Sequence, residues 1–204
     1  MTPHPQDIST KLIEAIASTP NICSSIHLPI QSGSNSVLKR MNRTYTIEEY
    51  LDLTARIRSM IPGVALSTDI IAGFPGETED DHRATLDAMR RVRYDGAFMF
   101  KYSPRENTKA WEMGDDVPEE VKVRRLSEII DLQNAIATEI NAELVGATVE
   151  VLIEKVSAKS GDEWMGRTDN NKFVVMPKAG ASIGDIVNVK IVKTNSATLM
   201  GTIV

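Results

Sequence analysis

The chain has 204 residues, of which 42% are hydrophobic and 25% charged, as in ordinary globular proteins of one or two domains. Its net charge of −5 argues mildly against a nucleic-acid partner, but residues 141–204 hold seven basic and seven acidic residues, so a local basic face is allowed there. No apolar run is long enough for a membrane span, and the N-terminus does not resemble a signal peptide. A single cysteine excludes a disulfide framework. Together these features predict a cytoplasmic protein with no membrane partner.

Short β-like runs alternate with helical runs over the first 145 residues. This order predicts βα units around a parallel sheet. The strand candidates are residues 25–30, 65–71 and 96–102.

Three helices in this part have start signals. Thr46 with Glu49 forms a capping box, and Thr78 can cap a helix with an acidic first turn. A third helix is expected to start at Pro118, to run for about 27 residues and to stop at Gly146, connecting two domains. Its expected buried face consists of Val121, Leu126, Ile129, Ile130, Gln133, Ile136, Ile140 and Leu144.

The pattern changes after residue 146, where short strands follow one another with polar turns. Five strands within about 60 residues suggest a small closed or OB-like barrel. The strand candidates are residues 148–156, 163–168, 172–176, 185–194 and 198–204. We therefore expect one domain over residues 1–140 and another over residues 141–204.

Alternation along the strands of a barrel sorts side chains between the lumen and the helix layer. Because three aliphatic residues of the first strand fit the helix layer, His27 and Gln31 are expected to point inward, into the lumen. Asp69 and Lys101 are expected to point inward near the C-terminal ends of the next two strands. Active sites of α/β barrels form at this end of the strands. Each residue alone also has a plainer interpretation: Asp69 in a structural hydrogen-bond network, His27 as a core histidine, and Cys23 as a small buried hydrophobe.

Glycine-rich turns, QSGS and AGFPGET, follow the first two strands directly. Gly33, Gly73 and Gly76 let the backbone approach a ligand closely or adopt a positive φ. Ordinary βα turn chemistry is the alternative for any one of these glycines.

Several segments resemble the second half of a radical SAM barrel and, more narrowly, the radical SAM methylthiotransferase family. They are HLPIQSGSNSVLKRMNRTYT (27–46), STDIIAGFPGET (67–78) and FMFKYSPR (98–105). The first resembles the tRNA-modifying branch that makes 2-methylthio-N6-(isopentenyl)adenosine. TPHPQDIS resembles the segment before the family's fourth barrel strand, so Met1 suggests a truncated chain or a fragmentary gene. Residues 141–204, with MGRTDNNKFVVM (165–176), resemble the TRAM domain, an RNA-binding β-barrel.

The resemblance implies an α/β fold: a partial, half TIM-like radical SAM barrel followed by a small all-β OB-like TRAM barrel. It implies S-adenosyl-L-methionine and two [4Fe-4S] clusters in the full-length enzyme, whose missing N-terminal part binds both. The radical made from S-adenosylmethionine would abstract hydrogen from C2 of the modified adenosine 37 of tRNA, where sulfur and a methyl group are then added. Cys23 matches no cluster motif, and one thiol cannot supply the roughly four ligands of a cluster.

The resemblance also implies site residues. Gln31 and Ser32 would lie near the ribose or methionine portion of the cofactor. The other cofactor contacts would be Asp69 and Gly73 along its length and Tyr102, Ser103 and Pro104 near adenine. Lys101 and Arg105 would meet substrate phosphate or the cofactor carboxylate, or else pair with Asp69 or a surface acid.

Around the turn of the second domain, Arg167, Asn170, Asn171, Lys172 and Phe173 combine cation, amide and aromatic groups. This combination suits RNA binding, although composition alone also fits a plain polar hairpin turn.

Two other functions stay open: a stand-alone RNA-binding module, and a methylthiotransferase acting on a ribosomal protein or on threonylcarbamoyladenosine in tRNA. A half-barrel also exposes two sheet edges, so we expect marginal stability or pairing with another copy.

Overall fold

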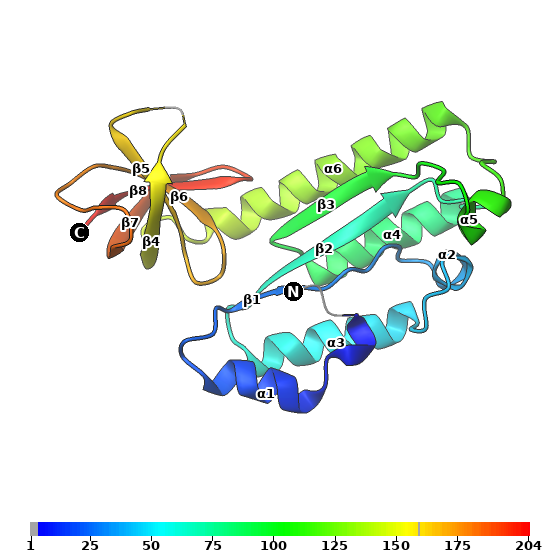
Figure 1. Ribbon diagram of the computed structural model, residues 1–204, viewed down its shortest axis with the longest axis horizontal. Helices are drawn as coiled ribbons and strands as arrows, with labels where there is room; N and C mark the ends of the chain where they lie inside the picture. Colours follow the sequence, from blue (N-terminus) through cyan, green and yellow to red (C-terminus); the bar gives the residue numbers. More distant parts are fainter. Residues whose placement is uncertain (1–3, 159) are drawn as a thin grey trace.

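The computed structural model describes residues 4–158 and 160–204. The expectation about Met1, and the first two residues of the TPHPQDIS match, fall on residues 1–3 and so lie outside the described residues. Figure 1 shows two parts along the long axis: an α/β part and a small β-barrel joined by the long helix α6.

The α/β part contains a parallel sheet of order β1-β2-β3, as predicted. Its elements are η1 (Pro5–Asp7), α1 (Thr10–Ser18), β1 (Ser25–His27), α2 (Asn35–Arg40), α3 (Ile47–Met60), β2 (Ala65–Ala72), α4 (Glu79–Val92), β3 (Gly96–Lys101), α5 (Lys109–Glu112) and α6 (Glu119–Ala142). Strand β1 is shorter than expected because Pro29 has no N–H to donate, and pairing resumes only at the bridge between Gln31 and Ile70.

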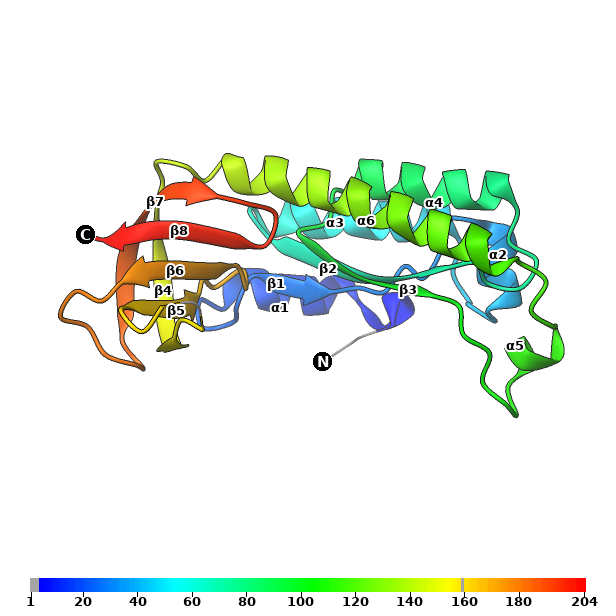
Figure 2. The ribbon, with the colours of Figure 1, turned by 90° about the horizontal axis from the view of Figure 1, so that it is seen from above.

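Helices cover one face of this sheet. Figure 2 shows α3, α4 and α6 side by side on one side of β2 and β3. Beneath them, Tyr94 donates from Oη to the Oη of Tyr50 at 2.9 Å, and Tyr50 donates to the carbonyl of Leu28 at 2.7 Å. Burial raises the pKa of both phenols, so both stay neutral donors within the core.

The predicted helix starts are confirmed. Thr46 and Glu49 form a capping box at α3, and Thr78 forms one with Asp81 at α4. Satisfying backbone N–H groups that have no partner in the helix fixes where each helix begins. The sequence patterns did not predict α1, α2 or α5.

Helix α6 is 24 residues long, with Pro118 as its N-cap rather than its first helical residue. Of its expected face, Ile129, Gln133 and Ile136 are buried, and the other expected residues are only partly covered. The buried face also includes Ala137 and three polar or charged residues outside the predicted set: Lys122, Arg125 and Asn141.

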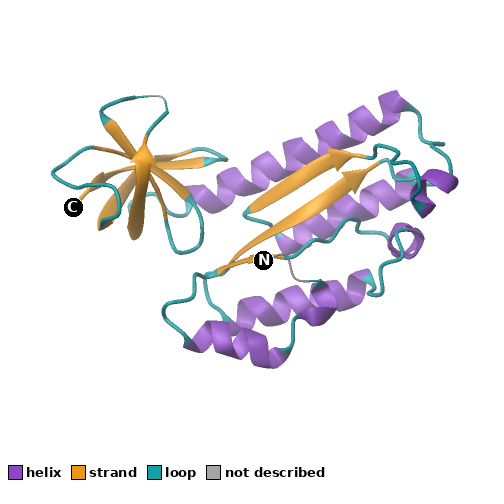
Figure 3. Ribbon diagram, viewed as in Figure 1, coloured by secondary structure: helices purple, strands orange, loops and turns teal. Residues whose placement is uncertain are grey.

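The second part is a closed five-stranded barrel of order β4-β5-β6-β8-β7, which confirms the predicted architecture. Its strands are β4 (Thr148–Val156), β5 (Glu163–Arg167), β6 (Phe173–Pro177), β7 (Ile186–Thr194) and β8 (Thr198–Ile203). Its own core consists of Val151, Val174, Met176, Val189, Ile191 and Leu199. In Figure 3 the arrowheads of β2 and β3 point away from the barrel, which therefore lies at the N-terminal end of these strands.

Gly33 offers a test of how tightly the turn after β1 packs against α4. A Cβ at this position would lie 2.4 Å from the carbonyl oxygen of Ala84 and 2.6 Å from Cα of Thr85, so backbone has to move. We predict that Gly33→Ala destabilises the α/β part by about 1–3 kcal/mol, as overpacking does elsewhere.

Urea unfolding followed by circular dichroism at 222 nm reports this part, because it holds all the helices described. Gly96→Ala is the matched control, since a Cβ there meets no atom within 4 Å. Equal midpoints for the two variants would contradict the close approach.

Candidate functional site

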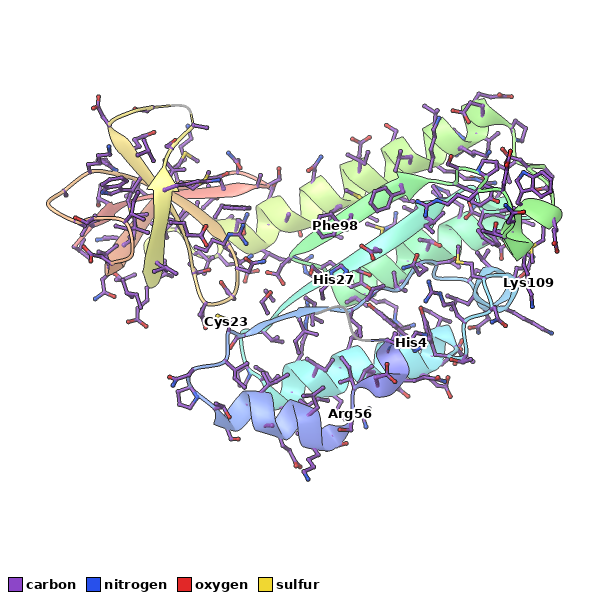
Figure 4. All side chains as sticks on the ribbon, viewed as in Figure 1. His4, Cys23, His27, Arg56, Phe98 and Lys109 are labelled. Atoms are coloured by element: carbon purple, nitrogen blue, oxygen red, sulfur yellow. The ribbon has the colours of Figure 1, made fainter. Side chains whose placement is uncertain are left out.

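Polar and aromatic side chains meet on the face of the sheet that the helices leave uncovered. His27 lies 3.0 Å from Ser67 Oγ through Nδ1 and 3.4 Å from Asp69 Oδ2 through Nε2. Its ring meets that of Phe98 edge to face at 5.7 Å, and Figure 4 shows the two side by side. The prediction that His27 and Asp69 share the inward face is confirmed.

The register explains why this face is also apolar. Phe98 pairs with Asp69 and Phe100 with Ile71 across the parallel ladder, so both phenyl rings belong to the uncovered face. They are 59% and 55% exposed, unusually high values for phenylalanine. The face therefore combines a small polar cluster with an apolar wall, the usual make-up of a ligand site.

The inward orientation predicted for Lys101 is wrong. Ala97 and Met99, which share its side of β3, pack against the helix-covered core. Lys101 accordingly forms an ion pair with Glu119 at the start of α6. Glu119 is the surface acid that the alternative interpretation of Lys101 expects as its partner.

The turn after β1 is held by its neighbours rather than left open. Gln31 has a φ of +63° and is 7% exposed, and its backbone N–H donates to the Asp69 carbonyl at 2.8 Å. Ser32 is fully buried, with its Oγ 3.3 Å from Thr85 Oγ1. Gly33 approaches the backbone of α4, so the glycine serves helix packing there.

The turn after β2 depends on a buried ion pair. Gly73, at φ +73°, donates its N–H to Glu77 Oε1 at 3.0 Å. The same oxygen accepts from Arg125 Nη1 at 2.9 Å, and Arg125 also donates to the Glu77 carbonyl at 3.0 Å. The two side chains are 2% and 5% exposed. Burial raises the pKa of Glu77, while the Gly73 N–H and the Arg125 guanidinium act in the opposite direction.

Lys122 packs beside this turn. It pairs with Asp115, and its Nζ lies 5.6 Å from the centroid of the Tyr102 ring. A Cβ on Gly73 would come within 2.4 Å of Lys122 Cγ, so this position needs glycine for space as well as for its φ. Tyr102 also meets Phe74 edge to face at 5.3 Å.

One polar atom at this edge has no partner. Tyr102 Oη is buried and makes no hydrogen bond within the described part of the chain. A buried hydroxyl without a partner is costly, so this atom fits a polar ligand group at the C-terminal edge of the sheet. Ser103, Pro104 and Arg105 follow on an exposed loop.

Sequence reasoning missed Lys122 and Arg125. Their spacing could have identified them, because both lie three or four residues from the next member of the buried face that continues through Ile129, Gln133 and Ile136. An apolar criterion excludes charged residues, although long cations can lie along a core when a buried acid meets them.

The turn between β5 and β6 gathers most of the predicted RNA-contacting residues. The Arg167 guanidinium stacks 4.4 Å from the centroid of Phe173 and donates to Asn171 Oδ1 at 2.7 Å. Asn170 Oδ1 accepts from Thr168 at 2.5 Å.

Lys172 is different, because its ammonium is already engaged within the chain. It lies 2.7 Å from Asp95 Oδ1 and is 10% exposed. The ammonium expected to contact RNA is therefore held by Asp95 of the α/β part.

The described residues do not fit an iron–sulfur cluster. No group of three or more His, Cys, Asp or Glu residues within 4–158 and 160–204 is placed to hold a metal ion. Cys23 is exposed, so its interpretation as a buried hydrophobe is wrong, and it lies on the connection from α1 to β1 beside the barrel (Figure 4). Among the helices described, none is long and apolar enough to cross a membrane.

Comparison with known proteins adds family information. The model of the radical SAM superfamily matches residues 1–89, and that of the TRAM domain matches residues 142–204. Two curated relatives are each called tRNA-2-methylthio-N(6)-dimethylallyladenosine synthase. The one from Chlorobium phaeovibrioides is 55% identical over 98% of this chain and 45% of its own length. The one from Phocaeicola vulgatus is 53% identical over 98% of this chain and 44% of its own length. The chain thus spans less than half of these relatives.

A solved structure supports the fold. The radical SAM enzyme coproporphyrinogen III oxidase from Escherichia coli aligns with a TM-score of 0.57 at 15% identity. The alignment covers 82% of this chain and 45% of that one. At this identity the likeness concerns the fold alone.

The Arg125–Glu77 pair generates a prediction about stability. Arg125→Met leaves the Glu77 carboxylate buried without its cation, which should cost about 3–5 kcal/mol at pH 7. Loss of the cation also raises the pKa of Glu77 further in the folded variant. Because the folded state then binds the proton more tightly than the unfolded state, the deficit should shrink as the pH falls toward about 4.3.

Urea unfolding at pH 7 and pH 5 measures this change. Arg90→Met, which removes an exposed ion pair with Asp87 on α4, is the control and should change stability by less than about 1 kcal/mol. A deficit for Arg125→Met that is the same at both pH values would contradict a buried, ionised Glu77.

Proposed function

We propose that this chain, as a member of the radical SAM methylthiotransferase family with a TRAM domain, forms the C-terminal part of a tRNA methylthiotransferase. The observation that carries the proposal is the 52–55% identity over almost the whole chain to synthases of 2-methylthio-N(6)-dimethylallyladenosine in tRNA. The proposed reaction of the complete protein is sulfur insertion and methyl transfer at C2 of N6-isopentenyladenosine 37. We expect this chain alone to be inactive, because it spans less than half of these relatives and its single cysteine cannot supply the ligands of a cluster.

S-adenosyl-L-methionine is the proposed cofactor. When bound, it supplies the radical that starts the reaction and the methyl group, while two [4Fe-4S] clusters belong to the missing N-terminal part. Gln31, Ser32, Asp69, Gly73, Tyr102, Ser103 and Pro104 are its proposed contacts in this chain. The Tyr102 hydroxyl supports this placement because it is buried without a partner among the described residues. Ser32 would contribute its backbone, since its hydroxyl meets Thr85.

The uncovered face has a proposed role in positioning the substrate. Ser67 holds the His27 ring at 3.0 Å, and His27 in turn lies 3.4 Å from Asp69 and orients its carboxylate. Phe98 and Phe100 offer a flat apolar wall on which a nucleobase can pack and from which water is excluded once the face is covered.

tRNA is the proposed macromolecular partner. Arg167, Asn170, Asn171 and Phe173 are placed to contact it, with the stacked guanidinium and phenyl ring suited to a phosphate and a base. Arg105 on its exposed loop is a further proposed phosphate contact. The division at residues 140 and 141 and a cytoplasmic location belong to the same proposal, the former supported by the TRAM match over 142–204.

The proposed function is tested in a strain that lacks the gene. Mass spectrometry should show tRNA with N6-isopentenyladenosine at position 37 and without the methylthio group. Unchanged methylthiolation would refute the proposal. If the methylthio group is instead missing from threonylcarbamoyladenosine in tRNA, or from a ribosomal protein of the same strain, the related activities are favoured.

The TRAM turn gives a prediction for this chain by itself. Arg167→Ala should weaken tRNA binding and lower the slope of log affinity against log salt by about 1, since one phosphate contact is lost. Gel-shift titrations at several salt concentrations measure both quantities.

Arg83→Ala is the matched control, because it removes an exposed arginine from α4 in the other part. An equal loss in both variants would show that binding follows net charge rather than the turn. Tight binding that survives deletion of residues 141–204 would contradict the assignment to the barrel.

A further inference from the structure

We infer that Lys172, Asp95 and Asn141 are positioning residues that hold the TRAM barrel in one orientation relative to the parallel sheet. The orientation is the one in which the Arg167 turn faces the N-terminal end of the uncovered sheet face. The consequence for catalysis rests on the proposed function, whereas the structural claim does not.

The three side chains come from both parts of the chain. Lys172 Nζ lies 2.7 Å from Asp95 Oδ1 and donates to Asn141 Oδ1 at 3.0 Å. Lys172 precedes β6 of the barrel, Asp95 precedes β3 of the sheet, and Asn141 is near the end of α6. One ammonium therefore connects the barrel to two elements of the other part.

Each acceptor is itself fixed. The second oxygen of Asp95 accepts from the backbone N–H of Leu66 at 3.0 Å, which ties it to β2. Asn141 Nδ2 donates to the carbonyls of Asn195 and Ser196, at 2.8 and 3.3 Å, in the turn between β7 and β8. The barrel is thus held through two of its turns.

Burial makes this contact depend on orientation. The side chains of Lys172 and Asp95 are only 10% and 14% exposed. A rotation of the barrel that separates them would leave two charges partly buried without a partner, which is costly. An apolar contact would tolerate such sliding, whereas this pair does not.

A cavity beside the pair shows why orientation matters. It has a volume of about 340 Å³ and lies between the sheet and the barrel. Its lining includes Ser67 and Phe98 from the uncovered face and Asn170, Asn171 and Phe173 from the barrel. RNA held at the turn therefore lies next to the uncovered face only while the barrel keeps this orientation.

The structural claim is tested with residual dipolar couplings on this chain. In the wild type and in Lys172→Arg, which keeps the charge, one alignment tensor should fit the amides of both parts. In Lys172→Met, the barrel and the sheet should need different tensors. Lys193→Met, which removes an exposed lysine of β7, is the control and should behave as the wild type. A single tensor for Lys172→Met would overturn the inference.

Asp95→Asn provides a second variant in case Lys172→Met unfolds. It removes the charge but keeps an oxygen that can accept from Leu66. It should also separate the two tensors, and a shared tensor in this folded variant would overturn the inference equally.

The catalytic consequence is tested in the full-length protein. Lys172→Met should leave the Kd for tRNA unchanged and lower the single-turnover rate of methylthiolation at least about tenfold, as misplacement of a substrate does. Lys172→Arg should restore the rate. A parallel loss of affinity and rate would instead make Lys172 an RNA contact and overturn its positioning role. A wild-type protein without methylthiolation activity would refute the proposed function, while the dipolar couplings would still decide the inference.

Discussion

The contacts of α6 determine the arrangement of both ends of the molecule. Near its N-terminus, Arg125 donates to the buried Glu77 carboxylate, which in turn accepts from Gly73 in the turn after β2. Near its C-terminus, Asn141 meets Lys172 and the turn between β7 and β8. A helix of 24 residues extends about 36 Å, so one rigid element relates the proposed cofactor edge to the proposed RNA-binding barrel.

Polar contacts carry this arrangement at both ends. The apolar cores of the two parts are separate, and each forms around its own sheet or barrel. Hydrophobic burial accounts for the stability of each part but is tolerant of relative sliding. Separating the partners of the buried pairs Arg125–Glu77 or Lys172–Asp95 would leave charges buried without a partner. The two pairs therefore favour one arrangement of α6, the sheet and the barrel.

The features set by local chemistry could be predicted from the sequence. The capping box at Thr46, the N-cap at Thr78 and the inward face of β2 with Asp69 follow from short-range spacing, and the structure confirms them. The pairs between distant residues could not be predicted in this way. Arg125 and Glu77 are 48 residues apart and Lys172 and Asp95 are 77 apart, so local patterning shows each residue only as a surface charge. Alternation alone predicts the wrong face for Lys101 for a related reason: the phase of β3 is set by its register with β2, which places Phe98 and Phe100 inward.

The uncovered face holds His27 and Asp69 in place but leaves both side chains partly open to solvent. His27 and Asp69 are 21% and 27% exposed, so solvent screens their interaction. In the longer relatives, more than half of the protein lies outside the part matched here. Covering the face with that remainder would remove water from around Phe98 and Asp69 and strengthen every electrostatic contact there. This chain therefore fixes where these polar groups lie, whereas the strength of their electrostatic interactions depends on whether the sheet face is covered.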